Sequence, residues 1–513
     1  MTRGRMSPAC SKTAVALLCA IGVLVSTSEA FSLIVYEGQV VQSWPDHPGP
    51  ELSEGSAAFV LGQESYYPAP KGEVWGLTIL VEFSDESSAF TVDEIDAWLN
   101  QLDYSDGGLN GSIRDYFLSN SNGMLDFRNE IVGFYEAEQP KSYYQGGNGY
   151  ERASELVAEV IEHFDPTVDF SRFDNDGDGS TEAISIAYAG DGGTFAQGIW
   201  PHSGSLGENR DGVRLNRYMM TALEDSLGIY VFAHESGHMI FGWPDLYGFG
   251  DYCVMGNATD PRNPAGINDF YRADQGWIPT VVIEPTTNAV YAAQPNAGGY
   301  VYLNPADDGE AFFWSNIRNV DRWEVLRGSG LLMFHFDYGI RTNDPPNPLC
   351  LAVVQADGLD ELGGTTWPSP GSDADDFFHA GSADEISDET SPSTHWNDGS
   401  ASGLRVYDIS ESAETMTFTV GTGTPEDLTP IYPDDNSAGA SSTGGAGNSG
   451  AGGTQTASGG SGDGGSAGEN TTTGGNSSTG GAATEGTGGV NASTGGTTSS
   501  GSWGALLASV GWG

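Results

Sequence analysis

The sequence predicts a mixed α/β domain of the α+β kind, followed by an all-β, sandwich-like module and a disordered tail. Three observations support this prediction. Residues 72–282 alternate buried apolar runs with helical stretches, whereas residues 283–421 hold short alternating runs separated by turns. From residue 422 to residue 513 the chain consists largely of Gly, Ser, Thr, Ala and Asn.

The first 30 residues are typical of a secretory signal peptide. Basic residues precede an apolar run over residues 13–25, and Ser28-Glu29-Ala30 matches a small-x-small cleavage pattern. A membrane anchor is the alternative, but this run is too short to span a bilayer comfortably. We expect a secreted, extracellular protein with no stable membrane span in the mature chain. Residues 31–71 are weakly patterned and are expected to be an N-terminal arm or a short pro-segment.

Residues 72–282 hold the elements expected of the first domain. The apolar run over residues 74–83 predicts a buried strand, and Thr91 to Glu94 forms a capping box that opens a helix. The further elements expected, in order, are helices over 112–118 and 152–164, a buried strand over 183–189, a buried helix whose apolar start is 227–233, and a helix over 267–276.

The region from 283 to 421 predicts a β-sandwich because its apolar residues alternate in short runs. These runs cover residues 300–303, 331–336, 351–354 and 415–420. The tail from 422 to 513 cannot bury enough apolar surface to offset its ordering entropy. We therefore expect a flexible tether, suited to association with a cell surface.

The formal net charge is −51, from 70 acidic and 19 basic residues. Binding to nucleic acid is not expected, because phosphate recognition needs clustered Lys and Arg. The acidity agrees with an exported protein, expected to be a monomer, and with Ca²⁺ sites. Of four cysteines, Cys10 and Cys19 lie in the signal region. Cys253 and Cys350 either form one disulfide or stay as two thiols, and the sequence does not decide between these.

A His-Glu-x-x-His motif lies within residues 232–242. On a helix, the spacing of four puts His234 and His238 on one face, where both imidazoles can bind one Zn²⁺. Glu235 is placed to act on a water at the open coordination position. Chance is the alternative, but the chain has only eight histidines in 513 residues.

A catalytic zinc site needs a third protein ligand. No Glu occurs between His238 and Glu284, so a Glu from a downstream helix is not expected. The sequence Gly-Trp-Pro-Asp after the motif holds a Gly and a Pro that can end the helix, as in metzincins. Asp245 is the expected third ligand and Asp251 the reserve. The alternative role for Asp245 is to cap the following turn.

The motif and the following Trp-Pro-Asp-Leu-Tyr resemble the immune inhibitor A family of secreted metallopeptidases. The resemblance covers roughly residues 72–420, with one extra residue before the Pro-Asp pair and a short N-terminal region as departures. Other blocks that carry it are 77–85, 112–117, 169–179, 199–203, 252–256 and 353–358. It implies a zincin catalytic domain with a mixed sheet, and it makes Met255 the packing floor beneath the zinc; an ordinary core residue is the alternative for Met255.

Three other residues near the motif are candidates for the site. Tyr247 and Tyr252 can polarise the scissile carbonyl, with ordinary packing as the alternative. His202 either lines the cleft or bonds a nearby carbonyl, and we favour the second.

Asp174, Asp176 and Asp178 alternate with Asn and Gly like the start of an EF-hand calcium loop, with Glu182 as a further carboxylate. Ser185 replaces the bidentate Glu of an EF-hand, so we expect a different calcium site. A solvated acidic turn is the alternative.

The sequence thus predicts an exported zinc endopeptidase that hydrolyses peptide bonds of protein or peptide substrates, with Glu235 as general base. One alternative is an inactive relative that acts as a surface-displayed binding module. Another is a zinc hydrolase of non-peptide substrates.

Overall fold

A computed structural model describes residues 34–36, 39–41, 71–284, 288–307, 309–340, 349–359, 361–362, 373–421 and 433. The predicted signal peptide, most of segment 31–71 and almost all of the predicted tail lie outside these residues. The described chain has mixed α/β content, with several sheets and few helices, which confirms the coarse fold class. In this part of the chain, no helix is long and apolar enough to cross a membrane.

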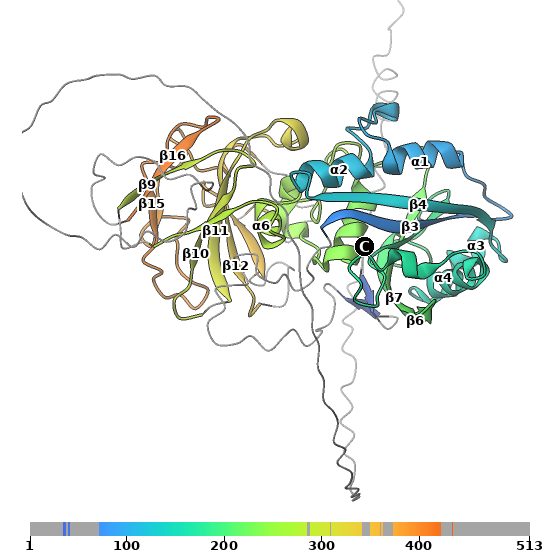
Figure 1. Cartoon of the computed structure of the whole chain (residues 1–513). Coiled ribbons are helices and arrows are strands. Elements are labelled where there is room, and N and C mark those ends of the chain that lie inside the picture. The colour runs from blue at the N-terminus through green and yellow to red at the C-terminus, as the bar shows by residue number, and fades with distance from the viewer. Residues whose placement is uncertain are drawn as a thin grey trace, which may run out of the picture. The chain divides into compact units, whose positions relative to one another are not determined.

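The first region is built on a seven-stranded mixed sheet in the order β2-β1-β6-β7-β5-β3-β4 (Figure 1). Strands β4, β3, β5 and β7 run parallel, β6 is antiparallel to β7, and β1 pairs parallel with β6. The strands are β1 (Ile34–Tyr36), β2 (Gln39–Val41), β3 (Gly72–Glu82), β4 (Leu125–Glu136), β5 (Ile184–Ala189), β6 (His202–Arg210) and β7 (Val213–Leu223).

The sheet separates two hydrophobic cores, and β3 contributes to both because its side chains alternate between the faces. Leu80 packs in the core that holds α1 (Val92–Asn100), α2 (Ile113–Asn120) and α5 (Tyr230–Ser236). Ile79 packs in the opposite core, which holds α4 (Glu151–Phe164); the short α3 (Lys141–Tyr144) lies near α4 (Figure 1).

The predicted capping box is present at the start of α1. The Thr91 amide donates to Glu94 Oε2 at 2.8 Å, and the Glu94 amide donates to Thr91 Oγ1 at 3.3 Å. The predicted helices 112–118, 152–164 and 267–276 correspond to α2, α4 and α6 (Asp269–Asp274). The predicted strands 74–83 and 183–189 correspond to β3 and β5.

Two sequence expectations differ from the structure. The motif helix α5 begins at Tyr230, so the apolar residues 227–229 are not helical. The sequence patterns also left β4, β6 and β7 unpredicted. Strand β6 is almost free of apolar residues, and it forms because β7 and β1 satisfy its backbone on both sides.

The described residues from 280 to 421 form two β-sheets, the first of which begins with β8, just before the predicted boundary. The first has the order β13-β12-β11-β10-β8 and the second β14-β15-β16-β9. Both contribute to one core, which holds Trp314 of the first sheet and Phe418 of the second. The strands are β8 (Thr280–Val282), β9 (Ala289–Ala293), β10 (Gly299–Leu303), β11 (Glu310–Ile317), β12 (Gly330–Asp337), β13 (Leu351–Val354), β14 (Ile386–Ser387), β15 (Arg405–Tyr407) and β16 (Met416–Val420).

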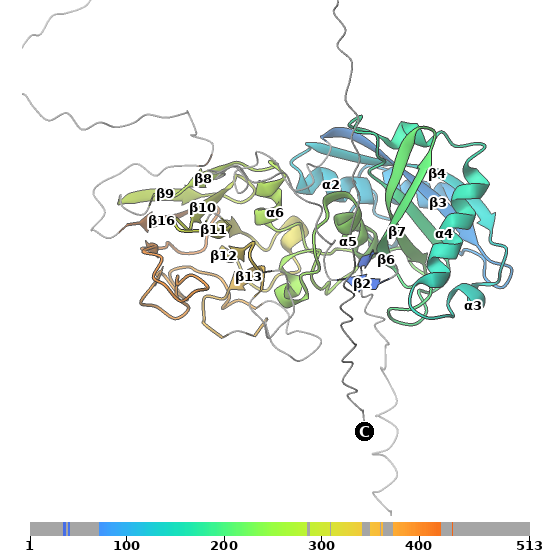
Figure 2. The same ribbon diagram turned by 90° about the horizontal axis from the view of Figure 1, so that it is seen from below.

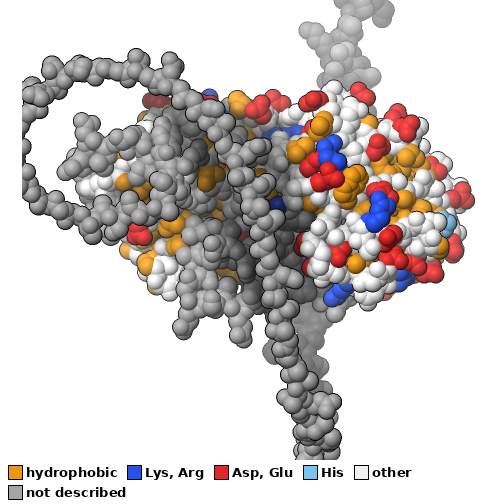
Figure 3. Space-filling model, viewed as in Figure 1, with side chains coloured by type: hydrophobic (Ala, Val, Ile, Leu, Met, Phe, Trp, Pro, Cys, Tyr) orange, Lys and Arg blue, Asp and Glu red, His pale blue; other side chains and the backbone are white. Residues whose placement is uncertain are grey.

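Packing is continuous across the predicted domain boundary at residue 282. Phe249 stacks on Phe334 at a centroid distance of 5.6 Å, and Phe270 lies 4.8 Å from Phe336. One core cluster therefore contains residues from both sides, and the domain division stays a prediction. On the part of the face that is not grey in Figure 3, carboxylates are scattered widely and basic side chains form no continuous patch.

A buried arginine ties α6 to the end of α2. Arg272 is 1% exposed and donates to Asp269 Oδ1 at 2.6 Å and to the Asn120 carbonyl at 2.7 Å. It also donates to Asn296 Oδ1 at 2.9 Å. A buried charge with several partners is costly to break, because each partner is then left unsatisfied.

We expect Arg272→Ala to lower the free energy of unfolding by about 3–5 kcal/mol, because it leaves the Asp269 carboxylate buried without its partner. The control is Arg152→Ala, which breaks the surface pair with Glu155 and should cost less than about 1 kcal/mol. Urea unfolding measures both. Equal losses in the two variants would contradict this role for Arg272.

Candidate metal centre

Helix α5 is buried on nearly all sides, because it packs between the sheet and α1 and α2. Phe232 packs edge-on against Trp98 at 5.3 Å, and the amides of Ile229 and Tyr230 donate to the Pro261 carbonyl at 2.8 and 3.0 Å. Figure 2 shows α5 beside β6 and β7. These contacts fix where the motif side chains project.

The helix changes its winding at the second histidine. After Ser236 it continues as one π-helical turn over Gly237–Phe241 and ends at Gly242, whose φ of 69° lies in the left-handed region. A Cβ at Gly237 would lie 2.4 Å from Met255 Sδ, so this close approach requires glycine. Met255 therefore lies directly against the motif helix, as the packing-floor interpretation and an ordinary core role both predict.

The turn after the helix brings Asp245 to the two histidines. His234 Nε2 lies 3.0 Å from His238 Nε2 and 3.1 Å from Asp245 Oδ1, and the third separation is 3.3 Å. Both histidines are 0% exposed and Asp245 is 7% exposed. The structure thus brings together the three residues predicted as zinc ligands.

Two backbone carbonyls orient the imidazoles. His234 Nδ1 lies 2.8 Å from the Val254 carbonyl, and His238 Nδ1 lies 2.6 Å from the Trp243 carbonyl. A carbonyl oxygen only accepts, so each Nδ1 carries a hydrogen. When such a ring is neutral, the lone pair of its Nε2 faces the other two ligand atoms. This arrangement attracts a cation to the space that the three acceptors share.

The charges of the site favour the same occupant. Burial lowers the pKa of His234, which keeps this ring neutral. Burial also opposes the charged form of His238, but the negative charges of Asp245 and Glu235 outweigh it and raise the pKa of His238. Burial alone would raise the pKa of Asp245, yet the two histidines lower it, so its carboxylate is ionised. Buried negative charge is unfavourable without a positive partner, and a bound cation would provide one.

The other candidates lie at different places. Glu235 is buried in α5 beside His234, and the ring of Tyr247 stacks near His234 at 6.2 Å with an interplanar angle of 15°. The hydroxyl of Tyr252 donates to Asp376 Oδ2 at 2.6 Å. Asp251 accepts from Thr259 Oγ1 at 2.6 Å and does not join the triad.

His202 is buried, and the Trp200 carbonyl lies 2.5 Å from its Nδ1, which confirms the expectation that it bonds a nearby carbonyl. The Tyr218 hydroxyl lies 2.9 Å from Nε2. Burial lowers the pKa of His202 to about 4, so the ring is neutral over the ordinary pH range. No disulfide joins Cys253 and Cys350. Burial raises the pKa of Cys253 to about 11.

The acidic loop before β5 brings together Asp174, Asp176 and Asp178, whose carboxylates approach within 4.8 Å of one another. Glu182 does not join them. Its Oε2 instead accepts from the Asn175 amide at 2.9 Å and from Asn175 Nδ2 at 2.7 Å. Three of the four predicted calcium residues therefore lie together.

Sequence reasoning missed a second group of carboxylates, which holds Asp357, Glu361 and Asp373. These residues follow no motif spacing, so local sequence patterns do not predict that they lie together. Arg217 of β7 was also missed. Its Nη1 donates to the carbonyls of Met239 at 3.1 Å and His238 at 3.4 Å, which secures the π-helical turn.

Comparison with known proteins finds no protein-family model that matches the chain and no match among curated proteins. The resemblance to the immune inhibitor A family thus stays a prediction from the motifs, and the geometry of the site is the independent observation.

We expect Asp245→Ala to remove bound metal or weaken its binding at least about tenfold, because a ligand is lost. Asp251→Ala is the matched control and should keep the wild-type metal content. Elemental analysis of the purified full chain measures both. If Asp251→Ala lost the metal and Asp245→Ala kept it, the third ligand would be Asp251.

Proposed function

We propose that this protein is an exported zinc endopeptidase of the immune inhibitor A kind, with a zincin catalytic domain. One observation carries the proposal: two imidazole nitrogens and one carboxylate oxygen, all buried, face one another at 3.0–3.3 Å. Secretion is supported by the signal-like first 30 residues.

The donor set fits zinc. With Zn–N and Zn–O bonds of about 2.0–2.2 Å, tetrahedral ligands lie roughly 3.3 Å apart, close to the three observed separations. Calcium and magnesium prefer all-oxygen ligands, whereas imidazole suits zinc. Three protein ligands also match catalytic zinc sites, which keep one position for water or substrate.

When bound, a zinc ion supplies Lewis-acid activation of a water and of the scissile carbonyl. Glu235 follows His234 on the same buried helix and raises the pKa of His238 through its negative charge. Its buried carboxylate thus lies close enough to His238 to interact with it electrostatically. In the proposed mechanism, Glu235 takes a proton from the attacking water and passes it to the leaving amine.

Tyr247 is the better candidate for polarising the carbonyl oxygen, since its ring stacks near His234. Tyr252 remains the second candidate, although its hydroxyl donates to Asp376.

The acidic loop is proposed as a calcium site that stiffens the connection into β5. Asn175 exchanges hydrogen bonds with the backbone of Trp75 at 2.8 and 3.0 Å, and the Arg214 amide donates to the Gly179 carbonyl at 2.8 Å. The loop is thus held against β3 and β7, so a bound ion would stabilise the sheet as well.

Two alternatives differ in what they predict. A surface-displayed binding module has no need for Glu235 and would bind its partner without hydrolysis. A zinc hydrolase of another substrate class would depend on Glu235 but would leave casein intact. Cleavage of a protein substrate therefore separates the peptidase from both.

We expect Glu235→Gln to keep the fold and the bound zinc but to lose casein cleavage by at least about 100-fold, because the general base is lost while the ligands stay. Cleavage is followed with and without a zinc chelator, and metal content is measured on the same samples. Wild-type rates in Glu235→Gln would contradict the proposed mechanism, and an intact casein substrate with the wild-type protein would contradict the peptidase function.

Removal of calcium should lower the melting temperature, by about 2–4 °C for each kcal/mol of binding energy lost. Asp176→Ala should abolish this dependence, whereas Asp93→Ala, an exposed carboxylate outside the loop, should preserve it. Calorimetry with added calcium or a calcium-selective chelator provides the measurement. A wild-type melting curve that ignores calcium would reduce the loop to an acidic turn.

A further inference from the structure

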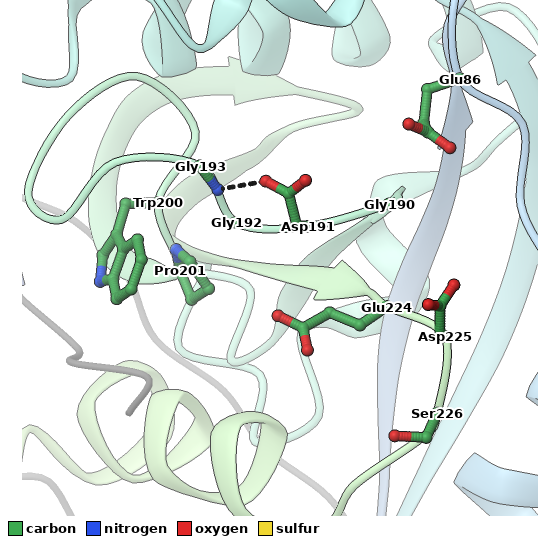
Figure 4. A pocket seen from close by; sticks show the side chains of 10 residues that line it. All are labelled: Glu86, Gly190, Asp191, Gly192, Gly193, Trp200, Pro201, Glu224, Asp225 and Ser226. Carbon is green, nitrogen blue, oxygen red and sulfur yellow. Dashed lines mark hydrogen bonds between the residues drawn. The ribbon is translucent and has the colours of Figure 1, made fainter. Parts of the chain in front are cut away.

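A second site opens at one edge of the seven-stranded sheet. Strands β3, β5 and β7 are parallel neighbours, and the segments that follow them border a hollow of about 470 Å³ (Figure 4). The volume lies within the range of about 300–1,000 Å³ typical of small-molecule sites. Ligands often bind outside the carboxyl ends of parallel strands, because the loops there converge.

The lining of this hollow is strongly acidic. Glu86 follows β3, Asp191 follows β5, and Glu224 and Asp225 follow β7, so four carboxylates surround one space (Figure 4). None of the four forms an ion pair within the described part of the chain. Burial raises the pKa of Glu224, and the charges of Asp191 and Asp225 raise it further, although the charge of Lys141 acts against this. The site is therefore short of positive charge.

A buried lysine adjoins the same hollow without a hydrogen-bond acceptor. Lys141 is 4% exposed, and its Nζ has no hydrogen-bond partner among the described residues. A Cβ at Gly190, which lines the hollow, would lie only 2.2 Å from this Nζ. The ammonium thus lies directly beside Gly190 and the Glu86 side chain, two residues of the lining.

Lys141 does not neutralise the site. Burial lowers its pKa, although the negative charges of Asp191 and Glu86 act against this. One ammonium faces four carboxylates. The missing partner must supply positive charge for the carboxylates and an acceptor for the lysine.

A divalent metal ion does not fit this requirement. Within the described residues, three groups of His, Asp or Glu lie close enough to share an ion, and none includes these four carboxylates. They are spread around a larger space. An organic cation fills such a space and can also lie against the indole of Trp200, which forms one wall.

The geometry points to a binding site for the basic side chain of a polypeptide, arginine or lysine, at this hollow. Its guanidinium or ammonium group would donate to Glu224 and its neighbours, and a main-chain carbonyl would accept from Lys141. This site goes beyond the proposed peptidase function and does not depend on it, because binding needs no turnover.

Calorimetry on the full chain tests the proposal with three probes: N-acetyl-arginine amide, its uncharged citrulline counterpart, and agmatine, a free guanidinium without a carbonyl. We expect the arginine amide to bind at least about tenfold more tightly than the citrulline amide, because charged hydrogen bonds are lost. Glu224→Gln should weaken the arginine amide by a similar factor. Glu411→Gln removes an exposed carboxylate that does not line the hollow and should have no effect.

The variant Lys141→Met distinguishes a site for a polypeptide from a site for a free organic cation. It should weaken the arginine amide relative to agmatine, because only the amide offers a carbonyl to the lysine. The site would be overturned if the arginine and citrulline amides bound equally. It would also be overturned if Glu224→Gln kept the wild-type affinity and an unchanged melting curve. Equal affinity of agmatine and the arginine amide, unchanged by Lys141→Met, would overturn the assignment to a polypeptide.

Discussion

The two hydrogen bonds from imidazole Nδ1 atoms to backbone carbonyls set the chemistry of the metal centre. Because the carbonyls of Val254 and Trp243 accept only, they fix both tautomers and leave both Nε2 atoms facing the space that they share with Asp245. Rotating either ring would place a hydrogen at the centre and remove the preference for a cation. The motif therefore depends on residues that lie outside it in sequence.

These carbonyls are in turn placed by packing against the helix. Gly237 lets Met255 approach closely, and the Val254 amide donates to the Gly266 carbonyl at 3.2 Å. On the other side, Arg217 holds the π-helical turn to β7. The site is thus positioned from both the sheet and the segment after the helix, which explains why its ligands are almost fully buried.

The parts of the site that could be predicted from the sequence are those set by local spacing. Helical periodicity alone places His234 and His238 on one face, and the Gly and Pro after the helix indicate where Asp245 returns. Local spacing did not predict the π-helical turn or the role of Arg217. Arg217 lies on β7 and contacts the turn only in the folded protein. Strand β6 was missed for the same reason, since its formation depends on its neighbours rather than its own composition.

The position of the acidic hollow also could not be predicted from local sequence patterns. Glu86, Asp191 and Glu224 are far apart in the chain, and no motif links them. They meet because three parallel strands end at one edge of the sheet, so only the strand order brings the carboxylates together. The net charge of −51 does not indicate where the negative charge concentrates. The topology defines where these carboxylates lie close together. Their negative charges add at that place, and the resulting negative potential favours binding of a cation.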